Sequence, residues 1–145
     1  MFFEFLATVC AGLFAGAAVY VSLVEHPARL ECGTQLAVTQ FGPSYRRGAV
    51  MQASLAAIGL GTGIGGWAAN RSTAVLIGSV ALGLAIPYTL LVILPTNKRL
   101  LDPSLDRSSG EAAALLARWG RLHAARSVLG AIAFGVLAWH LMAPR

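Results

Sequence analysis

The densest group of chemistry-bearing side chains lies near the start of the last long apolar segment, at Trp119, His123 and Arg126. In a helix these residues, at i, i+4 and i+7, share one face. A neutral imidazole accepts a proton near pH 7, and a guanidinium stabilises an oxyanion where water is excluded. The spacing therefore indicates acid–base chemistry on a substrate that ionises at oxygen, provided that other segments complete the site.

Polar residues also cluster at one end of each of the other apolar segments. In chain order they are Glu25 and His26, then Tyr45 and Gln52, then Thr89 and Asn97. Such side chains are costly at membrane depth and by default mark a functional site. We expect His26 and His123 to act as base and proton relay and Arg126 to hold a substrate oxygen. We expect the substrate to be bound by Glu25, Tyr45, Gln52, Thr89, Asn97 and Trp119.

Other interpretations of the same residues stay open. A buried arginine needs an anion, and Glu25 is the expected partner of Arg126, in a pair that could be purely structural. His26 and His123, on the first and last segments at equal depth, could instead be axial ligands of a haem or could bind a metal. A non-catalytic structural protein or a small carrier is a further alternative. We predict no cofactor for the acid–base interpretation.

The elements that must position these residues are membrane helices. Of the 145 residues, 57% are hydrophobic and only 12% are charged, and the mean hydropathy is +0.69. A soluble domain has about 25% charged residues. Four segments reach the length of about 20 apolar residues that a membrane span needs, at residues 5–24, 48–69, 73–94 and 115–142. We therefore predict one domain over residues 1–145, an all-α four-helix transmembrane bundle with up-down-up-down topology.

The distribution of basic residues predicts the orientation. The connections at 28–46 and 96–114, with their flanks, hold most of the arginine and lysine, which places both on the cytoplasmic side and both termini on the other. The net charge of +5 then reflects topology in an inner membrane of the bacterial type, and we expect no nucleic-acid partner. We expect the first helix to end near His26-Pro27, residues 28–46 to include an interfacial amphipathic helix, and Ser108 or Ser109 to cap the last helix.

Small residues dominate the other half of the segments, which is nearly free of polar groups. Gly12 and Gly16 form a small-xxx-small pair, the second segment has five glycines between 59 and 66, and the third has Ser79 and Gly83. In lipid such residues let helices approach closely and are compatible with self-association. Residues 61–66 also spell G-x-G-x-x-G, but no strand precedes them, which argues against a nucleotide site.

With these residues, the chain resembles a known family, the small four-helix membrane proteins of the DUF1772 class, which is also called the anthrone oxygenase-like family. The resemblance covers nearly the whole chain. It rests on the motifs Gly12-Leu13-Phe14-Ala15-Gly16, Glu25-His26-Pro27-Ala28-Arg29, Gln52, Ile86-Pro87-Tyr88-Thr89, Pro95-Thr96-Asn97-Lys98-Arg99-Leu100, and Trp119 through Arg126.

The resemblance implies a function as well as a fold. Some family members oxidise anthrones to anthraquinones with molecular oxygen in aromatic polyketide biosynthesis, and the family is usually described as needing no added cofactor. The implied partners are a hydrophobic aromatic small molecule, anthrone or quinol-like, together with O2 and the lipid bilayer. Kinship of fold does not by itself carry function, so the site must supply the argument.

Overall fold

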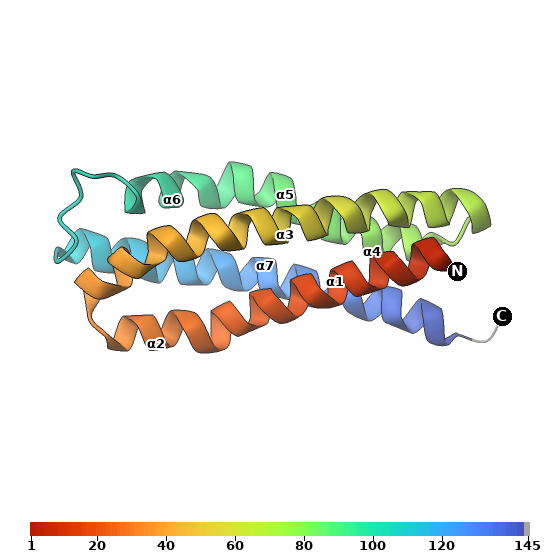
Figure 1. Ribbon diagram of the computed structural model, residues 1–145, viewed down its shortest axis with the longest axis horizontal. Helices are drawn as coiled ribbons and strands as arrows, with labels where there is room; N and C mark the ends of the chain where they lie inside the picture. The colour runs from red at the N-terminus through yellow and green to blue at the C-terminus, as the bar shows by residue number, and fades with distance from the viewer. Residues whose placement is uncertain (144–145) are drawn as a thin grey trace.

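The computed structural model describes residues 1–143, and these form helices joined by short turns and one longer loop. Figure 1 shows an elongated bundle with both termini and the 71–72 turn at one end and the 101–109 loop at the other. The four spans are α1 (Phe2–Tyr20), η1 (Val21–Glu25) and α2 (His26–Glu31); α3 (Thr34–Asn70); α4 (Thr73–Gly83), α5 (Ala85–Tyr88), η2 (Thr89–Ile93) and α6 (Leu94–Leu100); and α7 (Gly110–Met142).

All four spans are long and apolar enough to cross a membrane. Large apolar side chains such as Leu13, Ile58, Leu91 and Val128 point out of the bundle and are exposed. Lipid is the solvent in which such a surface is stable. The chain is therefore an integral membrane protein with an all-helical fold, as the composition predicts.

The helices extend well beyond the predicted apolar segments. The first span passes Pro27 and ends at Glu31, and α3 begins at Thr34. The residue just before α3, Gly33, has φ 86°, which glycine adopts without strain. The expected end at His26-Pro27 and the expected separate interfacial helix within 28–46 are therefore wrong, because those residues extend two long helices.

The extension has a physical cause in packing. Ala37, Val38 and Phe41, near the start of α3, belong to a buried cluster with Leu116 and Trp119 of α7. Hydropathy averaged over a segment registers lipid exposure and misses helix that is held by contacts within the protein. The second proline in this region, Pro43, lies inside α3 without ending it.

Two π-helical turns interrupt the first and third spans at matching positions. In η1 the N–H of His26 donates to the carbonyl of Val21, and in η2 the N–H of Leu94 donates to the carbonyl of Thr89, both five residues back. Each donor immediately precedes a proline, Pro27 or Pro95. A proline ring clashes with the carbonyl four residues earlier and lacks an N–H, so a wider turn lets each helix continue.

The half of the bundle nearest the termini is packed through small residues, which we call the packing half. A Cβ added at Gly63 would lie 1.6 Å from the Ser79 hydroxyl, and one at Gly130 would lie 2.8 Å from the Phe14 ring. The predicted close approach holds at Gly12, where the Phe134 ring would be 3.1 Å away, whereas Gly16 has no neighbour within 4 Å.

The packing half also contains one buried acid that the sequence interpretation missed. Glu4 is 1% exposed and accepts a hydrogen bond from the Asn70 side chain. His140 Nε2 lies 3.6 Å from its carboxylate, and His140 Nδ1 lies 3.2 Å from the Ser72 hydroxyl. This cluster joins α1, the α3–α4 turn and α7 at one end of the bundle.

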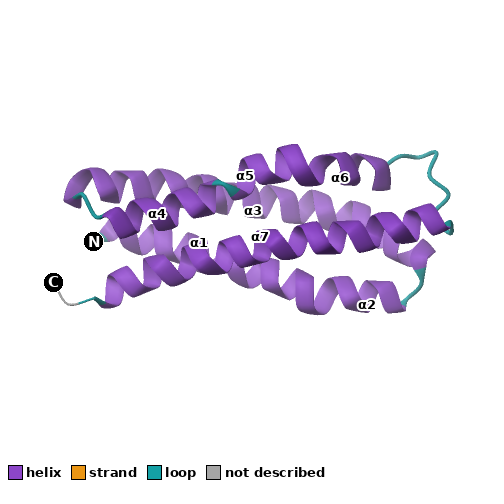
Figure 2. Cartoon of the chain, turned by 180° about the vertical axis from the view of Figure 1, so that it is seen from behind, coloured by secondary structure: helices purple, strands orange, loops and turns teal. Residues whose placement is uncertain are grey.

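The loop between α6 and α7, drawn in teal in Figure 2, is held by short-range hydrogen bonds. Asp106 accepts from the hydroxyl and the backbone N–H of Ser108, at 2.6 and 2.9 Å, and these bonds lower the pKa of its carboxyl. Ser109 accepts from Ala112 N–H at 3.1 Å. The predicted cap of the last helix is therefore confirmed at Ser109.

Candidate functional site

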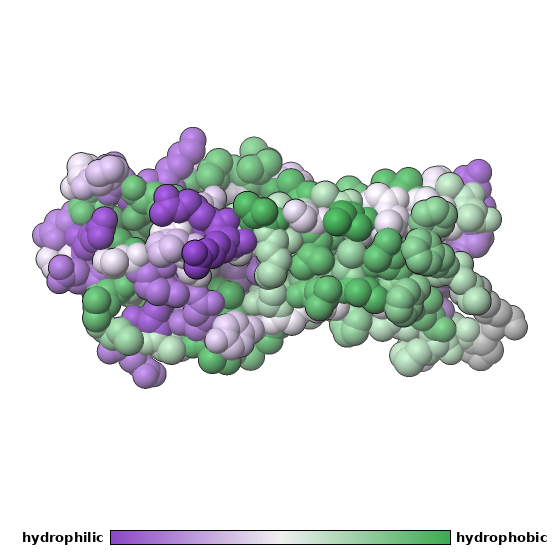
Figure 3. All heavy atoms as spheres, viewed as in Figure 1, coloured by the Kyte–Doolittle hydropathy of each residue, from purple (hydrophilic) through white to green (hydrophobic). Residues whose placement is uncertain are grey.

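A large cavity lies among the four spans in the half of the bundle away from the termini, which we call the cavity half. It has a volume of about 720 Å³, within the usual size of a small-molecule site. Its walls are mostly apolar, with residues such as Ala17, Phe41, Ala56 and Ile93. In Figure 3 hydrophilic side chains gather over this half, while the packing half is hydrophobic almost to its tip.

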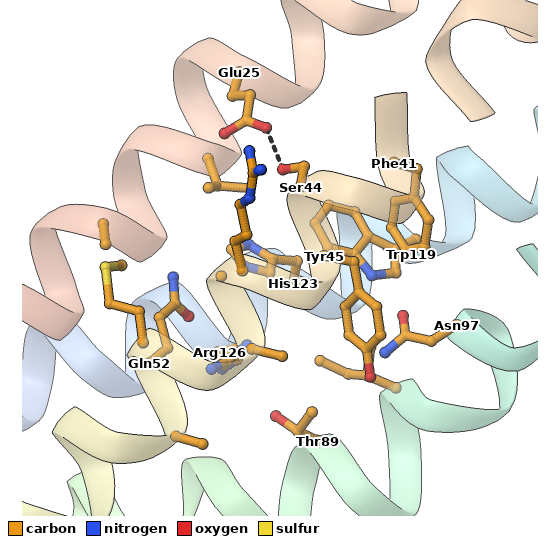
Figure 4. Close-up of a pocket in the computed structure, with 18 of the residues that line it drawn as sticks. Glu25, Phe41, Ser44, Tyr45, Gln52, Thr89, Asn97, Trp119, His123 and Arg126 are labelled. Carbon is orange, nitrogen blue, oxygen red and sulfur yellow. Dashed lines mark hydrogen bonds between the residues drawn. The ribbon is translucent and has the colours of Figure 1, made fainter. Parts of the chain in front are cut away.

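Eight of the nine predicted site residues line this cavity, and Figure 4 shows them converging from all four spans. They are Glu25, Tyr45, Gln52, Thr89, Asn97, Trp119, His123 and Arg126. The two π turns lie in its walls, since Val21 and Glu25 come from η1 and Thr89 and Ile93 from η2. Such turns are frequent at functional sites because they redirect side chains within a helix.

His123 is held from two sides. Its ring stacks on the Trp119 indole with centroids 4.7 Å apart and planes at 24°. Its Nδ1 lies 3.0 Å from the hydroxyl of Ser22 in η1. The ring is buried in the protein yet lines the cavity. Within the described chain its Nε2 has no hydrogen-bond partner, so this nitrogen is available to a bound molecule.

Arg126 lies one helical turn from His123 and also faces the cavity. Its guanidinium carbon is 5.0 Å from the centre of the Phe14 ring, and no acidic side chain of residues 1–143 pairs with it. The expected pair with Glu25 is therefore absent. A cation on an apolar cavity wall favours a ligand that carries or develops negative charge.

Several buried polar atoms at the cavity lack hydrogen-bond partners among the described residues. They are Oε1 of Gln52, Nδ2 and Oδ1 of Asn97, Nε1 of Trp119, and the Nε atoms of Arg29 and Arg126. Gln52 is 3% exposed and Asn97 is fully buried. Leaving such an atom unsatisfied costs about 1–3 kcal/mol, so these atoms are open to hydrogen bonds from any cavity occupant that offers both donors and acceptors.

Glu25 belongs to a hydrogen-bond network at the edge of the cavity. Its carboxylate accepts from Arg29, from Ser44 at 2.6 Å and from Gln40 at 3.1 Å. Arg29 is itself buried, with its guanidinium carbon 5.7 Å from the centre of the Trp119 ring. The network joins the first span to α3 beside the site. All three bonds reach one oxygen, Oε1, and they hold the Glu25 carboxylate toward Arg29 and α3 rather than toward Arg126.

His26 is the one predicted site residue that does not line the cavity. It is buried with its ring centroid 5.1 Å from that of Trp119. A Cβ on Gly120 would lie 2.6 Å from His26 Nε2, so glycine at that position makes room for the ring. Ligation of one haem or metal by His26 and His123 needs both rings to face a common space, and this structure places only His123 on the cavity.

Sequence reasoning missed three polar residues that shape the site: Ser22, Arg29 and Ser44. Ser22 lies within an apolar run, where a serine usually bonds its own helix, and Arg29 was counted with the residues that set topology. A search for polar residues one turn before Glu25-His26 and two turns before Gln52 would have found Ser22 and Ser44. Tyr88, at the same depth as Thr89, instead donates to the carbonyl of Leu122 at 3.1 Å.

Comparison with known proteins gives one match. A family model described as anthrone oxygenase matches residues 41–136. The matched range contains α3 from Phe41 onward, the third span and most of α7, and so includes every cavity residue except Gln40 and those of the first span. No curated protein and no solved structure matches the chain. Because the family model covers more than half of the sequence, the chain belongs to the anthrone oxygenase family.

Proposed function

We propose that the protein oxidises a hydrophobic aromatic compound of the anthrone or quinol-like class with O2, by base-assisted chemistry in the cavity. The observation that carries this proposal is that His123 and Arg126 both line a mostly apolar cavity and that Arg126 has no acidic partner among residues 1–143. A flat apolar substrate fits such walls. The imidazole and the guanidinium supply a base and a stabilising charge for the anion that the reaction needs.

For an anthrone, the chemistry starts at the ring methylene opposite the ketone. His123 Nε2 takes one methylene proton, and the electron pair moves into the ring system and onto the ketone oxygen, as a phenolate-like anion. Arg126 is the group placed to stabilise that oxygen, with the amides of Gln52 and Asn97 as further hydrogen-bond partners. Trp119, which lines the cavity beside His123, is the aromatic residue that we expect to contact the substrate ring.

The anion then supplies the electrons for O2. A bond forms between the former methylene carbon and oxygen, and the peroxide anion regains a proton from the His123 imidazolium. Breaking the remaining C–H and the O–O bond releases water and leaves a carbonyl. The sum is CH2 + O2 → C=O + H2O, a four-electron oxidation of the carbon and a four-electron reduction of O2. The base is regenerated, and no electrons come from elsewhere.

The test is turnover by protein purified in mild detergent. A hydroxylated anthrone and O2 are supplied, and O2 uptake and the absorbance of the quinone are followed together. Because anthrones oxidise slowly in air, the controls are buffer alone and a His123→Ala protein of equal concentration. We expect faster quinone formation at one O2 per substrate with the unaltered protein only. Equal rates for both proteins would refute the proposal.

An absorbance spectrum and a metal analysis of the same preparation test the alternative of a haem or metal protein. A Soret band or a metal at one equivalent would show that the cofactor-free mechanism is wrong. A colourless, metal-free protein that turns over an anthrone would support the mechanism as written.

A further inference from the structure

The hydrogen bonds around His123 form a chain in which the donor and the acceptor of each bond are fixed by the backbone carbonyls at one end. The chain runs from the carbonyls of Ala18 and His123 to the Ser127 hydroxyl, then to the Ser22 hydroxyl, and ends at His123 Nδ1. The Ser127 oxygen lies 2.9 Å from the Ala18 carbonyl oxygen and 3.2 Å from the His123 carbonyl oxygen. A carbonyl oxygen only accepts, so the single proton of Ser127 must point toward these carbonyls.

The next link follows from that proton. The Ser22 and Ser127 hydroxyl oxygens are 2.8 Å apart. Since Ser127 uses its proton on a backbone carbonyl, it can only accept here, and Ser22 must donate. The reverse direction would leave Ser127 facing two carbonyl oxygens with lone pairs alone, although a serine in a helix commonly donates to the carbonyl four residues back.

The last link sets the state of the imidazole. Ser22 has one hydroxyl proton and donates it to Ser127, so toward Nδ1 of His123, 3.0 Å away, it can only accept. Nδ1 must then carry the hydrogen. A neutral imidazole has one protonated nitrogen, so Nε2 is left with a free lone pair. The stack on Trp119 fixes the plane of the ring in which this lone pair lies.

We propose that Ser22 and Ser127 are positioning residues that hold neutral His123 as its Nδ1–H tautomer and thereby present Nε2 to the cavity as the base. Two hydroxyls and a backbone carbonyl do here what a carboxylate does for the histidine of a catalytic triad. The assignment of the tautomer does not depend on the proposed function. Only the identification of Nε2 as the base of the reaction rests on the proposed function.

The direct test is the nitrogen NMR spectrum of protein labelled with 15N-histidine, recorded in detergent or bilayers at a pH where His123 is neutral. His123→Ala identifies the signals of this residue among the three histidines. We expect Nδ1 to resonate as a protonated nitrogen and Nε2 as an unprotonated one. A protonated Nε2 and an unprotonated Nδ1 would overturn the proposal. The experiment needs no variant other than His123→Ala.

Three serine variants test the direction of the chain. Ser127→Ala removes the carbonyl-bound hydroxyl, which frees Ser22 to donate to Nδ1, so we expect the Nε2–H tautomer to become populated. Ser22→Ala should also abolish the single-tautomer spectrum, and Ser22→Thr, which keeps a hydroxyl, should restore it. Ser79→Ala is the matched control, since Ser79 is a buried serine of the packing half. An unchanged spectrum in both Ser127→Ala and Ser22→Ala would contradict the proposal.

Activity separates this inference from the proposed function. If both hold, Ser22→Ala lowers kcat by about 10- to 100-fold, the range typical of a metal-bound histidine that loses the group orienting it, with little change in KM, and Ser22→Thr recovers it. If the Nδ1–H tautomer is observed but His123→Ala still turns over an anthrone, the tautomer proposal stands and the proposed function fails.

Discussion

The packing half and the cavity half are built from the same four spans but differ in how closely the helices approach one another. In the packing half, glycines bring helices so close that an added methyl group would overlap a neighbour, as at Gly63 against Ser79. In the cavity half, proline-linked π turns and large aromatic residues surround about 720 Å³ of space. The first half depends on volume and the second on individual polar atoms. Substitutions should therefore have opposite consequences in the two halves.

The largest expected effect is on activity in the cavity half. His123→Ala removes the proposed base, and general acid–base catalysis contributes about 10²- to 10⁴-fold, so the quinone-forming rate should fall by that factor. Membrane insertion and the unfolding temperature in detergent should change little, because the cavity tolerates lost volume. A fall in the amount of folded protein that matches the fall in rate would remove the distinction between the halves.

The next effect is on stability in the packing half. Gly63→Ala places a Cβ against the Ser79 side chain, and overpacking of this kind costs about 1–3 kcal/mol. The free energy of unfolding in detergent or bicelles should fall by that amount, while turnover per folded molecule is retained. Gly61→Ala is the matched control, since no atom lies within 4 Å of the added group, and it should leave stability unchanged or raise it by about 0.5–1 kcal/mol through helix propensity.

A smaller effect concerns the exchange of a buried asparagine for leucine, which should change the free energy of unfolding with opposite signs in the two halves. Asn97 is buried with both amide atoms unpartnered among the described residues, so Asn97→Leu should leave stability unchanged or raise it by about 1 kcal/mol, while lowering turnover. Asn70 donates to the buried Glu4, so Asn70→Leu should lower stability by about 1 kcal/mol and leave turnover per folded molecule unchanged. Unfolding curves and rates of the two variants, measured side by side, check the signs.

The smallest expected effect on turnover is at His26. This ring packs beside Trp119 without lining the cavity, so His26→Gln should lower the rate less than about tenfold, far less than loss of the base. Rates for the His26 and His123 variants under one set of conditions make the comparison. A His26→Gln protein as inactive as His123→Ala would make His26 part of the proton path, as the sequence pattern alone predicted.

The sequence predicted the fold better than the ends of its helices. Apolar runs identify four membrane spans because lipid imposes length and composition. They do not identify the start of α3, where Val38 and Phe41 are buried against other parts of the protein. Nor do they reveal that Pro27 is passed by a π turn, since a proline in an apolar run usually signals a helix end.

For the site, the sequence predicted how deep along the bundle each polar residue lies, but not the direction in which each face of a helix points. Residues such as Gln52, Asn97 and Arg126 occur at one end of their segments, and the structure brings them to one cavity. The predicted pairing of Glu25 with Arg126 was wrong. The choice between Arg29 and Arg126 depends on which face of the first span turns toward α3. That rotation depends on the π turn before Pro27, and a proline alone does not show whether a helix ends there or continues through such a turn.

The two π turns make the spacing of residues along a helix as important as their identity. Each turn contains one residue more than an α-helical turn would, which rotates the following helix by about 100° relative to an uninterrupted α-helix. The first span thus has one angular phase before η1 and another after it. Deleting one residue within η1 would restore a single phase and turn Glu25 and Arg29 away from α3, with every residue facing the packing half left in place. A change in chain length, with no change in the chemistry of any side chain, would therefore disconnect the site from its scaffold.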